Sequence, residues 1–433
     1  MRRFTIDNTK NPFTLILGAL FLITGGTLLL AAHGHETLLL IASGAFCIVA
    51  VAAAFFYGYC LGALLMGALL SVLYDILQMF ARQVAVFCFA VGGILIAYFL
   101  FEFFFQNSPE KRDRVLKVFG FFGDCLFFLT LAAVAAVFVL SIWNIVLLIR
   151  ERDIVQPTGE LVELDRYKTI CMYDEGEGDH TLVFLSGSGT AEPILDFKGL
   201  TSQLEGCQRV VVPERLGYGF STGLRSNDIR TAQNIVLEYR KALEKAGIEG
   251  PFILVAHSMG GLHAIIWAQE HPEEVEAIIG LDMCVPGSYE NFDLKDALRR
   301  SRLGAAGRIF GFARIFYRDS FLPDTLDEQE KELYRAVACR KVSNSTVRDE
   351  LRKIDDALEV IAKKDLPGIP TLLFSSDGSE TGVEGWVTIQ EDYAASIPDA
   401  ELVLLEDCGH YMHNEQPELI AQDIKAFIDR LDS

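Results

Sequence analysis

The strongest constraint on the fold is an alternation of short apolar runs and amphipathic helical stretches, which begins near residue 160 and continues almost to residue 431. Runs such as FILVA (252–256) are too short for helices and are bounded by turn residues, which predicts strands. The other predicted strands lie at 161–165, 168–173, 181–186, 209–213, 276–282, 371–376 and 401–406, with the first two joined as a hairpin. Because buried parallel strands read as continuous apolar runs, we expect a mostly parallel, eight-stranded sheet with helices on both faces.

One long interval interrupts this rhythm. Residues 287–366 contain no good strand pattern and are too many for a plain connection, so they predict a helical cap. Within the cap, residues 297–319 mix arginines with aromatic side chains. Such a stretch fits the surface of an anionic membrane, the cover of a pocket, or a helical pair packed on its own domain with its arginines in water.

Residues 1–150 are much more apolar and predict a multi-pass transmembrane helical region. Residues 13–32, 84–105 and 125–148 each supply the roughly 20 apolar residues that a helix needs to cross a bilayer. Residues 37–74 suit one crossing or two, which gives four or five spans in all. A polar linker at 151–160 then leads to a domain at 161–433.

The distribution of charge restricts the partners. Lys and Arg around the predicted spans favour five crossings, which would place the domain at 161–433 on the extracytoplasmic side of an integral membrane protein. The chain has 58 Asp and Glu against 38 Lys and Arg, and all of this excess lies beyond residue 150. Nucleic acid is therefore not an expected partner, because phosphate binding depends on clustered Lys and Arg.

The nine cysteines include no CxxC pair, so a zinc site is not expected. Five of them lie beyond residue 150, and an odd number cannot all be paired in disulfides.

The stretch LVAHSMGG, residues 254–261, carries a candidate nucleophile. Ser258 follows an apolar strand pattern and opens a helical one, so we expect it on a sharp turn that exposes its hydroxyl. Ala256 and Gly260 are small enough to permit such a turn. At this position the backbone N–H of Met259 points to where an oxyanion would form. A serine hydroxyl also needs a base to become a nucleophile.

His410 is the candidate base. It follows the last predicted strand in DCGHYMHNEQPE, on a loop expected at the same edge of the sheet as Ser258. His263 and His271 lie along or at the end of the helix that follows the serine, where they could not readily reach over it. His413 is expected to approach the next helix.

Taken together, these motifs resemble the α/β-hydrolase family, in the branch of esterases, lipases and proline-type peptidases. SGSGT, PERLGYGFS, AHSMGG, HPEEVEAIIGLD and CGHYMHNEQPE occur in the family's order over about residues 160–431. The resemblance implies a catalytic serine, acid and histidine in that chain order, which Ser258, an acid near residue 377 and His410 reproduce.

The acid of this set must orient His410 and stabilise its positive charge. We expect Asp377 in FSSDGSE to be this acid. Glu380 and Asp282, which follows the preceding strand, are the alternatives.

The resemblance also implies a second oxyanion donor in SGSGT. Relatives usually have a histidine and glycine pair here, whereas this chain has Ser186 and Gly187. The backbone of Ser188 is then the expected donor, together with that of Met259.

The activity implied is that of a membrane-anchored serine hydrolase that cleaves carboxylic esters through an acyl-enzyme. Its partners would be a small-molecule acyl substrate, such as a lipid or another apolar compound, and the lipid bilayer. No metal or cofactor is required. An aminopeptidase or amidase of the same fold and a non-catalytic, ligand-binding membrane protein are the alternatives, and the sequence leaves the oligomeric state open.

Overall fold

The computed structural model of the 433-residue chain describes residues 132–133, 136–224, 228–290, 292–317 and 322–432. The predicted spans at 13–32, 37–74 and 84–105, and the first part of 125–148, lie outside these residues. Residues 136–150 are helical. Over the ranges described, no helix has both the length and the apolar character that a membrane crossing requires.

The chain divides into two compact units. One comprises Met1–Ile149 and Ile309–Gly311, and the other comprises Arg150–Arg308 and Phe312–Ser433. The second unit holds all eight strands found in the described residues.

These strands form one sheet in the order β1-β2-β4-β3-β5-β6-β7-β8. Strands β1 (Glu160–Asp165) and β2 (Lys168–Glu175) form an antiparallel hairpin, and β2 also runs antiparallel to β4 (Arg209–Pro213). The remaining strands run parallel to β4: β3 (Thr181–Leu185), β5 (Phe252–His257), β6 (Val275–Leu281), β7 (Thr371–Ser375) and β8 (Ala400–Leu404). The prediction of a mostly parallel, eight-stranded sheet is confirmed, with every strand boundary within two residues.

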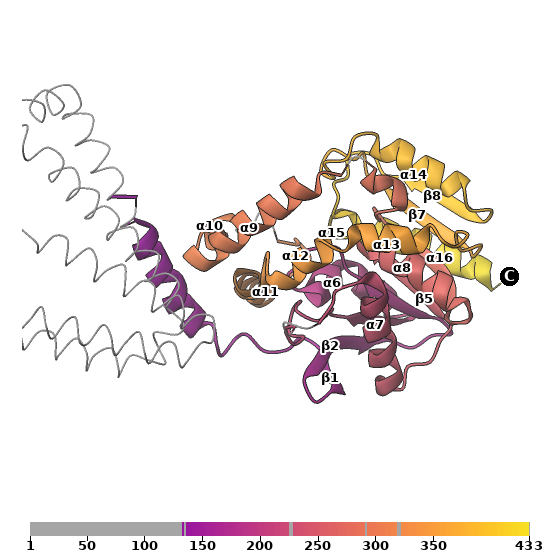
Figure 1. Ribbon diagram of the computed structural model, residues 1–433. Coiled ribbons are helices and arrows are strands. Elements are labelled where there is room, and N and C mark those ends of the chain that lie inside the picture. The colour runs from indigo at the N-terminus through magenta and orange to yellow at the C-terminus, as the bar shows by residue number, and fades with distance from the viewer. Residues whose placement is uncertain (1–131, 134–135, 225–227, 291, 318–321, 433) are drawn as a thin grey trace, which may run out of the picture. The chain divides into compact units, whose positions relative to one another are not determined.

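Helices cover both faces of the sheet (Figure 1). One face packs against α6 (Pro193–Leu204) and α16 (Pro417–Leu431). The other packs against α7 (Ala232–Ala246), α8 (Gly260–Glu270), α13 (Ile354–Ile361) and α14 (Trp386–Ala395). The side chains of the central strand β5 point alternately to the two faces of the sheet. Ile253 and Val255 belong to the core on the side of α6 and α16, and Leu254 and Ala256 belong to the core on the side of α7 and α8.

The cap, residues 287–366, consists over its described residues only of helices and their connections, as the missing strand pattern predicts. Its elements are η2 (Pro286–Tyr289), α9 (Leu294–Phe310), α10 (Ala313–Phe316), α11 (Glu328–Lys341), α12 (Ser345–Leu351) and α13. Helix α11 begins with a capping box, in which the Asp327 side chain accepts from the Glu330 amide and the Glu330 side chain accepts from the Asp327 amide.

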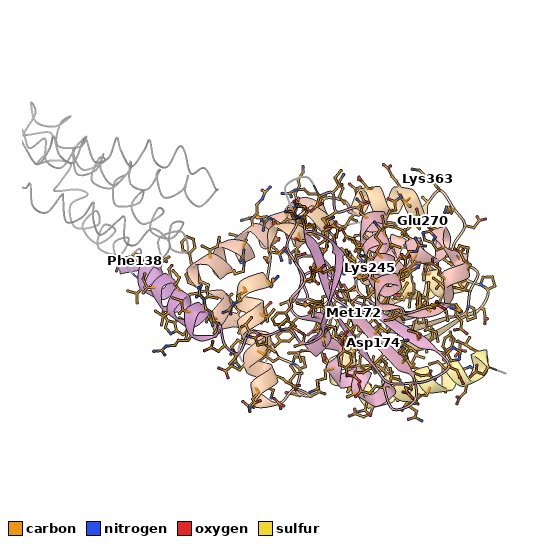
Figure 2. The ribbon with its side chains drawn as sticks, turned by 90° about the horizontal axis from the view of Figure 1, so that it is seen from below. Phe138, Met172, Asp174, Lys245, Glu270 and Lys363 are labelled. Carbon is orange, nitrogen blue, oxygen red and sulfur yellow. The ribbon has the colours of Figure 1, made fainter. Side chains whose placement is uncertain are left out.

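Strand β2 is buried in its middle and exposed at its C-terminal end. Figure 2 labels Met172, which is buried, and Asp174, which is exposed two residues further along the same strand. The Asp174 carboxylate pairs with Arg209 of β4, with an Nη2 to Oδ2 distance of 2.8 Å. Because both partners are partly in water, this ion pair contributes at most about 1 kcal/mol.

His180, just before β3, joins two distant parts of the chain. Its Nδ1 lies 2.9 Å from Glu276 of β6 and its Nε2 lies 3.1 Å from Asp432, beyond α16. Burial lowers the pKa of His180, but hydrogen bonds and charge from Glu276 and Asp432 outweigh burial and raise the pKa above its ordinary value.

A raised histidine pKa predicts a pH-dependent contribution to stability. The contribution is fully present below the ordinary histidine pKa of ~6.5 and is lost as pH rises through the higher folded-state value. We expect His180→Gln to lower the free energy of unfolding more at about pH 5.5 than at about pH 9. Urea denaturation of both proteins at the two pH values checks this, and an equal loss at both would contradict it.

Candidate active site

Ser258 lies on a strained turn between β5 and α8. Its φ angle is +50°, in the left-handed region that non-glycine residues rarely adopt. Such a conformation costs about 1–3 kcal/mol and persists only where the surrounding structure enforces it. Here the Ser258 carbonyl accepts hydrogen bonds from the amides of Gly261, at 3.0 Å, and Cys284, at 2.7 Å.

Three glycines allow the backbone to close around this turn. A Cβ at Gly260 would lie 2.2 Å from the carbonyl oxygen of Leu185 at the end of β3. A Cβ at Gly261 would lie 2.4 Å from the carbonyl oxygen of Cys284. A Cβ at Gly187 would lie 2.8 Å from the Cβ of Ser258, which places the SGSGT loop directly against the serine. Larger residues at these positions would push the turn open.

The structure brings His410 to Ser258. His410 lies between β8 and the short helix α15 (Met412–Glu415), and its Nε2 is 3.0 Å from the Ser258 Oγ. On the other side of the ring, its Nδ1 is 2.6 Å from Asp282 Oδ2. In the neutral tautomer that has its proton on Nδ1, the ring donates to the carboxylate and its Nε2 lone pair can accept from the serine.

Asp282 is fully buried directly after β6. Besides His410, its carboxylate accepts hydrogen bonds from the Ser376 amide and the Ser376 hydroxyl, both at 2.8 Å, and from the Trp386 indole N–H at 2.7 Å. These neutral donors satisfy the charge in the absence of water and orient one oxygen toward His410.

The structure therefore corrects the expectation that Asp377 lies against His410. Asp377 is exposed, and its carboxylate accepts from the Ser379 amide at 2.8 Å in a turn, an interaction that lowers the pKa of Asp377. The physical reason is where each carboxylate points. Asp282 directly follows β6, the strand beside β5, and is buried against His410, whereas the Asp377 carboxylate is held in an exposed turn after β7.

Glu380, the other alternative, contacts the backbone of His410 rather than its ring. Its carboxylate accepts from the His410 amide at 3.1 Å. It therefore fixes the position of the loop that carries His410.

Sequence reasoning missed a second anchor for this loop. His257, immediately before the serine, is buried and its Nε2 donates to the His410 carbonyl at 3.1 Å. Burial, together with the nearby His413 and His410, lowers the pKa of His257 well below its usual range, so this ring is neutral. The signal was present in LVAHSMGG, as a histidine at the last position of a fully buried strand.

The expected oxyanion donors lie on both sides of the turn. Met259 is the residue after the serine, and Ser188 lies in the SGSGT loop that presses on it. Among the described residues, no group accepts a hydrogen bond from the amide of Met259 or of Ser188. Both N–H groups are thus available to a bound oxygen atom.

Cys284 is a second nucleophilic side chain near the serine, with its Sγ 3.9 Å from the Ser258 Oγ. Burial raises the pKa of this thiol to about 11, so it stays protonated near neutral pH and is a poor nucleophile. All five cysteines of the described ranges are free thiols: Cys171, Cys207, Cys284, Cys339 and Cys408.

A buried group of potential metal ligands lies behind the serine. The ligand atoms of Asp196, His257 and His413 lie within 4.8 Å of one another. Two of these side chains bond to each other, with His413 Nε2 3.1 Å from Asp196 Oδ2, and Asp196 also accepts from the Tyr334 hydroxyl at 3.2 Å. These contacts pair the Asp196 carboxylate with two donors in the core.

Comparison with known proteins assigns the fold. The sequence profile of the alpha/beta hydrolase family matches residues 182–423, more than half of the chain. The chain belongs to this family. Uncharacterized protein YbdG of Bacillus subtilis (strain 168) is 34% identical to this chain over 211 residues, which cover 47% of this chain and 63% of YbdG, less than two thirds of its length.

Two further comparisons agree with this assignment. Lipase 1 of Psychrobacter immobilis is 24% identical to this chain over 297 residues, which cover 63% of this chain and 89% of the lipase. The crystal structure of a probable hydrolytic enzyme from Pseudomonas aeruginosa PAO1 superposes with a TM-score of 0.50 at 17% identity, covering 63% of this chain and 95% of that one. At that identity the structural likeness shows the fold alone.

The contacts of His410 predict different effects for two aspartate variants of the protein. Asp282→Asn should slow the reaction of Ser258 with a fluorophosphonate probe by about 10³- to 10⁴-fold, because the amide no longer holds the required histidine tautomer. Asp377→Asn serves as the matched control and should react at the wild-type rate. Rates of probe labelling followed by gel fluorescence check this, and a larger loss in Asp377→Asn would contradict it.

Proposed function

We propose that this protein is a serine hydrolase that cleaves carboxylic esters through an acyl-enzyme, with apolar acyl compounds such as lipids as substrates. The observation that carries the proposal is the chain of contacts from Ser258 Oγ to His410 Nε2, at 3.0 Å, and from His410 Nδ1 to Asp282, at 2.6 Å. A serine placed in this way has a base within hydrogen-bond reach, and the base is oriented by a buried carboxylate.

The first half-reaction forms the acyl-enzyme. His410 Nε2 takes the Ser258 proton while the serine oxygen attacks the ester carbonyl carbon, and the carbonyl oxygen becomes an oxyanion. The amides of Met259 and Ser188 stabilise this charge. The bond to the alcohol then breaks, His410 returns the proton to the leaving oxygen, and the acyl group remains on Ser258.

The second half-reaction repeats these steps with water. His410 removes a proton from the water that attacks the acyl carbon, and the bond to Ser258 breaks as the serine oxygen regains a proton. The products are a carboxylic acid and the free enzyme. Asp282 keeps its negative charge throughout and stabilises the positive charge that His410 carries between the proton transfers.

The proposed substrate class is supported by the relatives and by composition. Lipase 1 of Psychrobacter immobilis and Lipase 3 of Moraxella sp. (strain TA144) are both among the relatives. The long apolar runs of residues 1–150 are the basis for proposing that the protein is anchored in a bilayer, where apolar esters concentrate.

Replacement of the nucleophile tests the proposed function. Ser258→Ala should lower kcat for the p-nitrophenyl esters of butyrate and decanoate by at least about 10³-fold and abolish fluorophosphonate labelling, because the variant lacks the oxygen that attacks the carbonyl and the probe. Ser202→Ala, at an exposed position of α6, should hydrolyse both esters like the wild type. In the wild type, the decanoate ester should be a better substrate than the butyrate. Unchanged hydrolysis in Ser258→Ala would exclude this mechanism.

Protease accessibility tests the proposed membrane attachment and orientation. If residues 1–150 form five spans with the hydrolase domain outside the cytoplasm, protease added to intact cells should digest residues beyond 160. Immunoblotting with antibodies to each half of the chain measures this. Protection in intact cells followed by digestion after lysis would instead support four spans, and recovery of the full chain in the soluble fraction would refute attachment.

A further inference from the structure

A buried arginine holds the loop that carries the Ser188 amide. Arg215, which follows β4, donates from Nη1 to the Ser186 carbonyl and from Nη2 to the Gly187 carbonyl, the latter at 2.7 Å. The arginine is 1% exposed. Two parallel hydrogen bonds from one planar guanidinium fix both the position and the orientation of the two peptide groups that precede Ser188.

A tyrosine holds the same loop on the other side of Ser188. The Gly189 amide donates to the Tyr218 hydroxyl at 3.2 Å, and the Tyr218 ring lies beneath the Arg215 guanidinium, with its centroid 4.1 Å from the arginine Cζ. The peptide groups on both sides of Ser188 are therefore attached to two stacked side chains from the PERLGYGFS segment.

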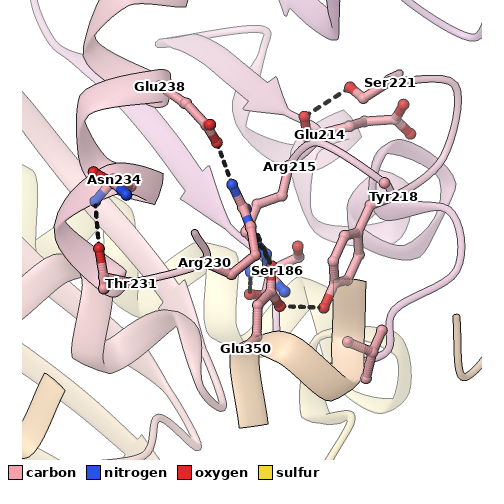
Figure 3. A network of polar contacts seen from close by, with 12 residues as sticks. Ser186, Glu214, Arg215, Tyr218, Ser221, Arg230, Thr231, Asn234, Glu238 and Glu350 are labelled. Atoms are coloured by element: carbon pink, nitrogen blue, oxygen red, sulfur yellow. Dashed lines mark hydrogen bonds and ion pairs between the residues drawn. The ribbon is translucent and has the colours of Figure 1, made fainter. Parts of the chain in front are cut away.

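A carboxylate from the cap joins these two side chains. Glu350 of α12 accepts from the Tyr218 hydroxyl at 2.6 Å, and its other oxygen lies 3.5 Å from Arg215 Nε. That second oxygen also accepts from Arg230 Nη2 at 3.1 Å (Figure 3). Glu350 is 3% exposed, so its charge is compensated almost entirely by these partners.

Helix α12 reaches the PERLGYGFS segment by a second route. The Asn344 side chain, at the start of α12, donates to the Gly217 carbonyl at 2.8 Å. A Cβ at Gly217 would lie 2.3 Å from the Thr346 Oγ1, so helix and segment touch without a gap. A displacement of α12 would therefore be transmitted to Tyr218 and Arg215.

We propose that Glu350 is a positioning residue for oxyanion stabilisation: from the cap, it holds Arg215 and Tyr218 so that the Ser188 amide faces the reacting carbonyl oxygen. The inference rests on the proposed function, since it assigns a role to a residue in the same reaction. If Glu350 had a purely structural role, it would stabilise the packing of the cap on the domain without affecting the reaction rate of the folded enzyme. The proposed role predicts that replacing Glu350 weakens binding of the transition state even in enzyme that is folded.

The first experiment replaces Glu350 in the full-length protein. Glu350→Gln keeps the size of the side chain and removes its charge. It should lower kcat for p-nitrophenyl esters by about 10- to 100-fold with little change in KM, because the oxyanion contact strengthens only in the transition state. The matched control is Asp349→Asn, since Asp349 is the neighbouring carboxylate on α12 and its side chain is 45% exposed. This control should retain wild-type kcat.

Active-site titration separates the reaction from folding. All rates are expressed per Ser258 labelled by a fluorophosphonate at completion, so that unfolded protein does not count. The affinity of Glu350→Gln for a trifluoromethyl ketone, which forms an oxyanion with the serine, should fall by the same factor as kcat. A normal kcat per labelled serine, with only a lower melting temperature, would overturn the inference.

A second variant covers the case in which Glu350→Gln does not fold. Tyr218→Phe removes the hydroxyl that joins Gly189 to Glu350 but leaves every charge in place. It should also lower kcat and the affinity for the trifluoromethyl ketone. Combined with Glu350→Gln, the two effects should be less than additive because the residues act through one contact. Wild-type values in Tyr218→Phe would overturn the inference.

These outcomes are distinguishable from failure of the proposed function. If the wild type neither hydrolyses esters nor labels at Ser258, the function itself is wrong. If the wild type is active, Ser258→Ala is inactive and Glu350→Gln is as fast as wild type, only the role of Glu350 is wrong.

Discussion

The turn at Ser258 is the constraint on which the rest of the site depends. At this positive-φ serine, backbone from two other segments, residues 185–187 and the stretch at Cys284, approaches the turn closely, and Gly187, Gly260 and Gly261 leave the space for it. The same approach brings the SGSGT loop against the serine and anchors the segment after β6 to the serine's carbonyl. Asp282 is held between two such contacts, since its own amide donates to the Phe374 carbonyl of β7 and the Cys284 amide two residues later donates to the Ser258 carbonyl.

The sequence allowed accurate prediction of the central strands because they are buried on both faces of the sheet, so that apolar content alone marks them. Strand β5 illustrates this, with side chains in both cores and a predicted range one residue shorter than observed. Ser258 and His410 could also be predicted from the sequence, since each follows a recognisable strand. Ser258 and His410 are each marked by the residues around them in the sequence, so predicting them does not require knowing which strands lie side by side.

The acid required information that the sequence does not carry. Asp282 and Asp377 both follow apolar strands, and the choice between them depends on which strand lies beside β5 and where the chain turns afterwards. The Asp-Gly pair at 377 and 378 was a usable sign of a surface turn, and Asp377 does serve such a turn. The pairing of Arg215 with Glu350 joins residues 135 positions apart, and only the packing of the cap reveals it.

Trp386 gives the site a property that its chemistry does not need. Its indole donates to the carboxylate of Asp282, and its ring meets the His410 ring edge-on, with 6.2 Å between centroids. The electron distribution of an excited indole responds to nearby charge, so a proton gained or lost by His410 changes the field that this ring experiences. The protein therefore has an indole against two residues of its proposed triad, so a change in the charge of either residue alters the surroundings of an intrinsic fluorophore.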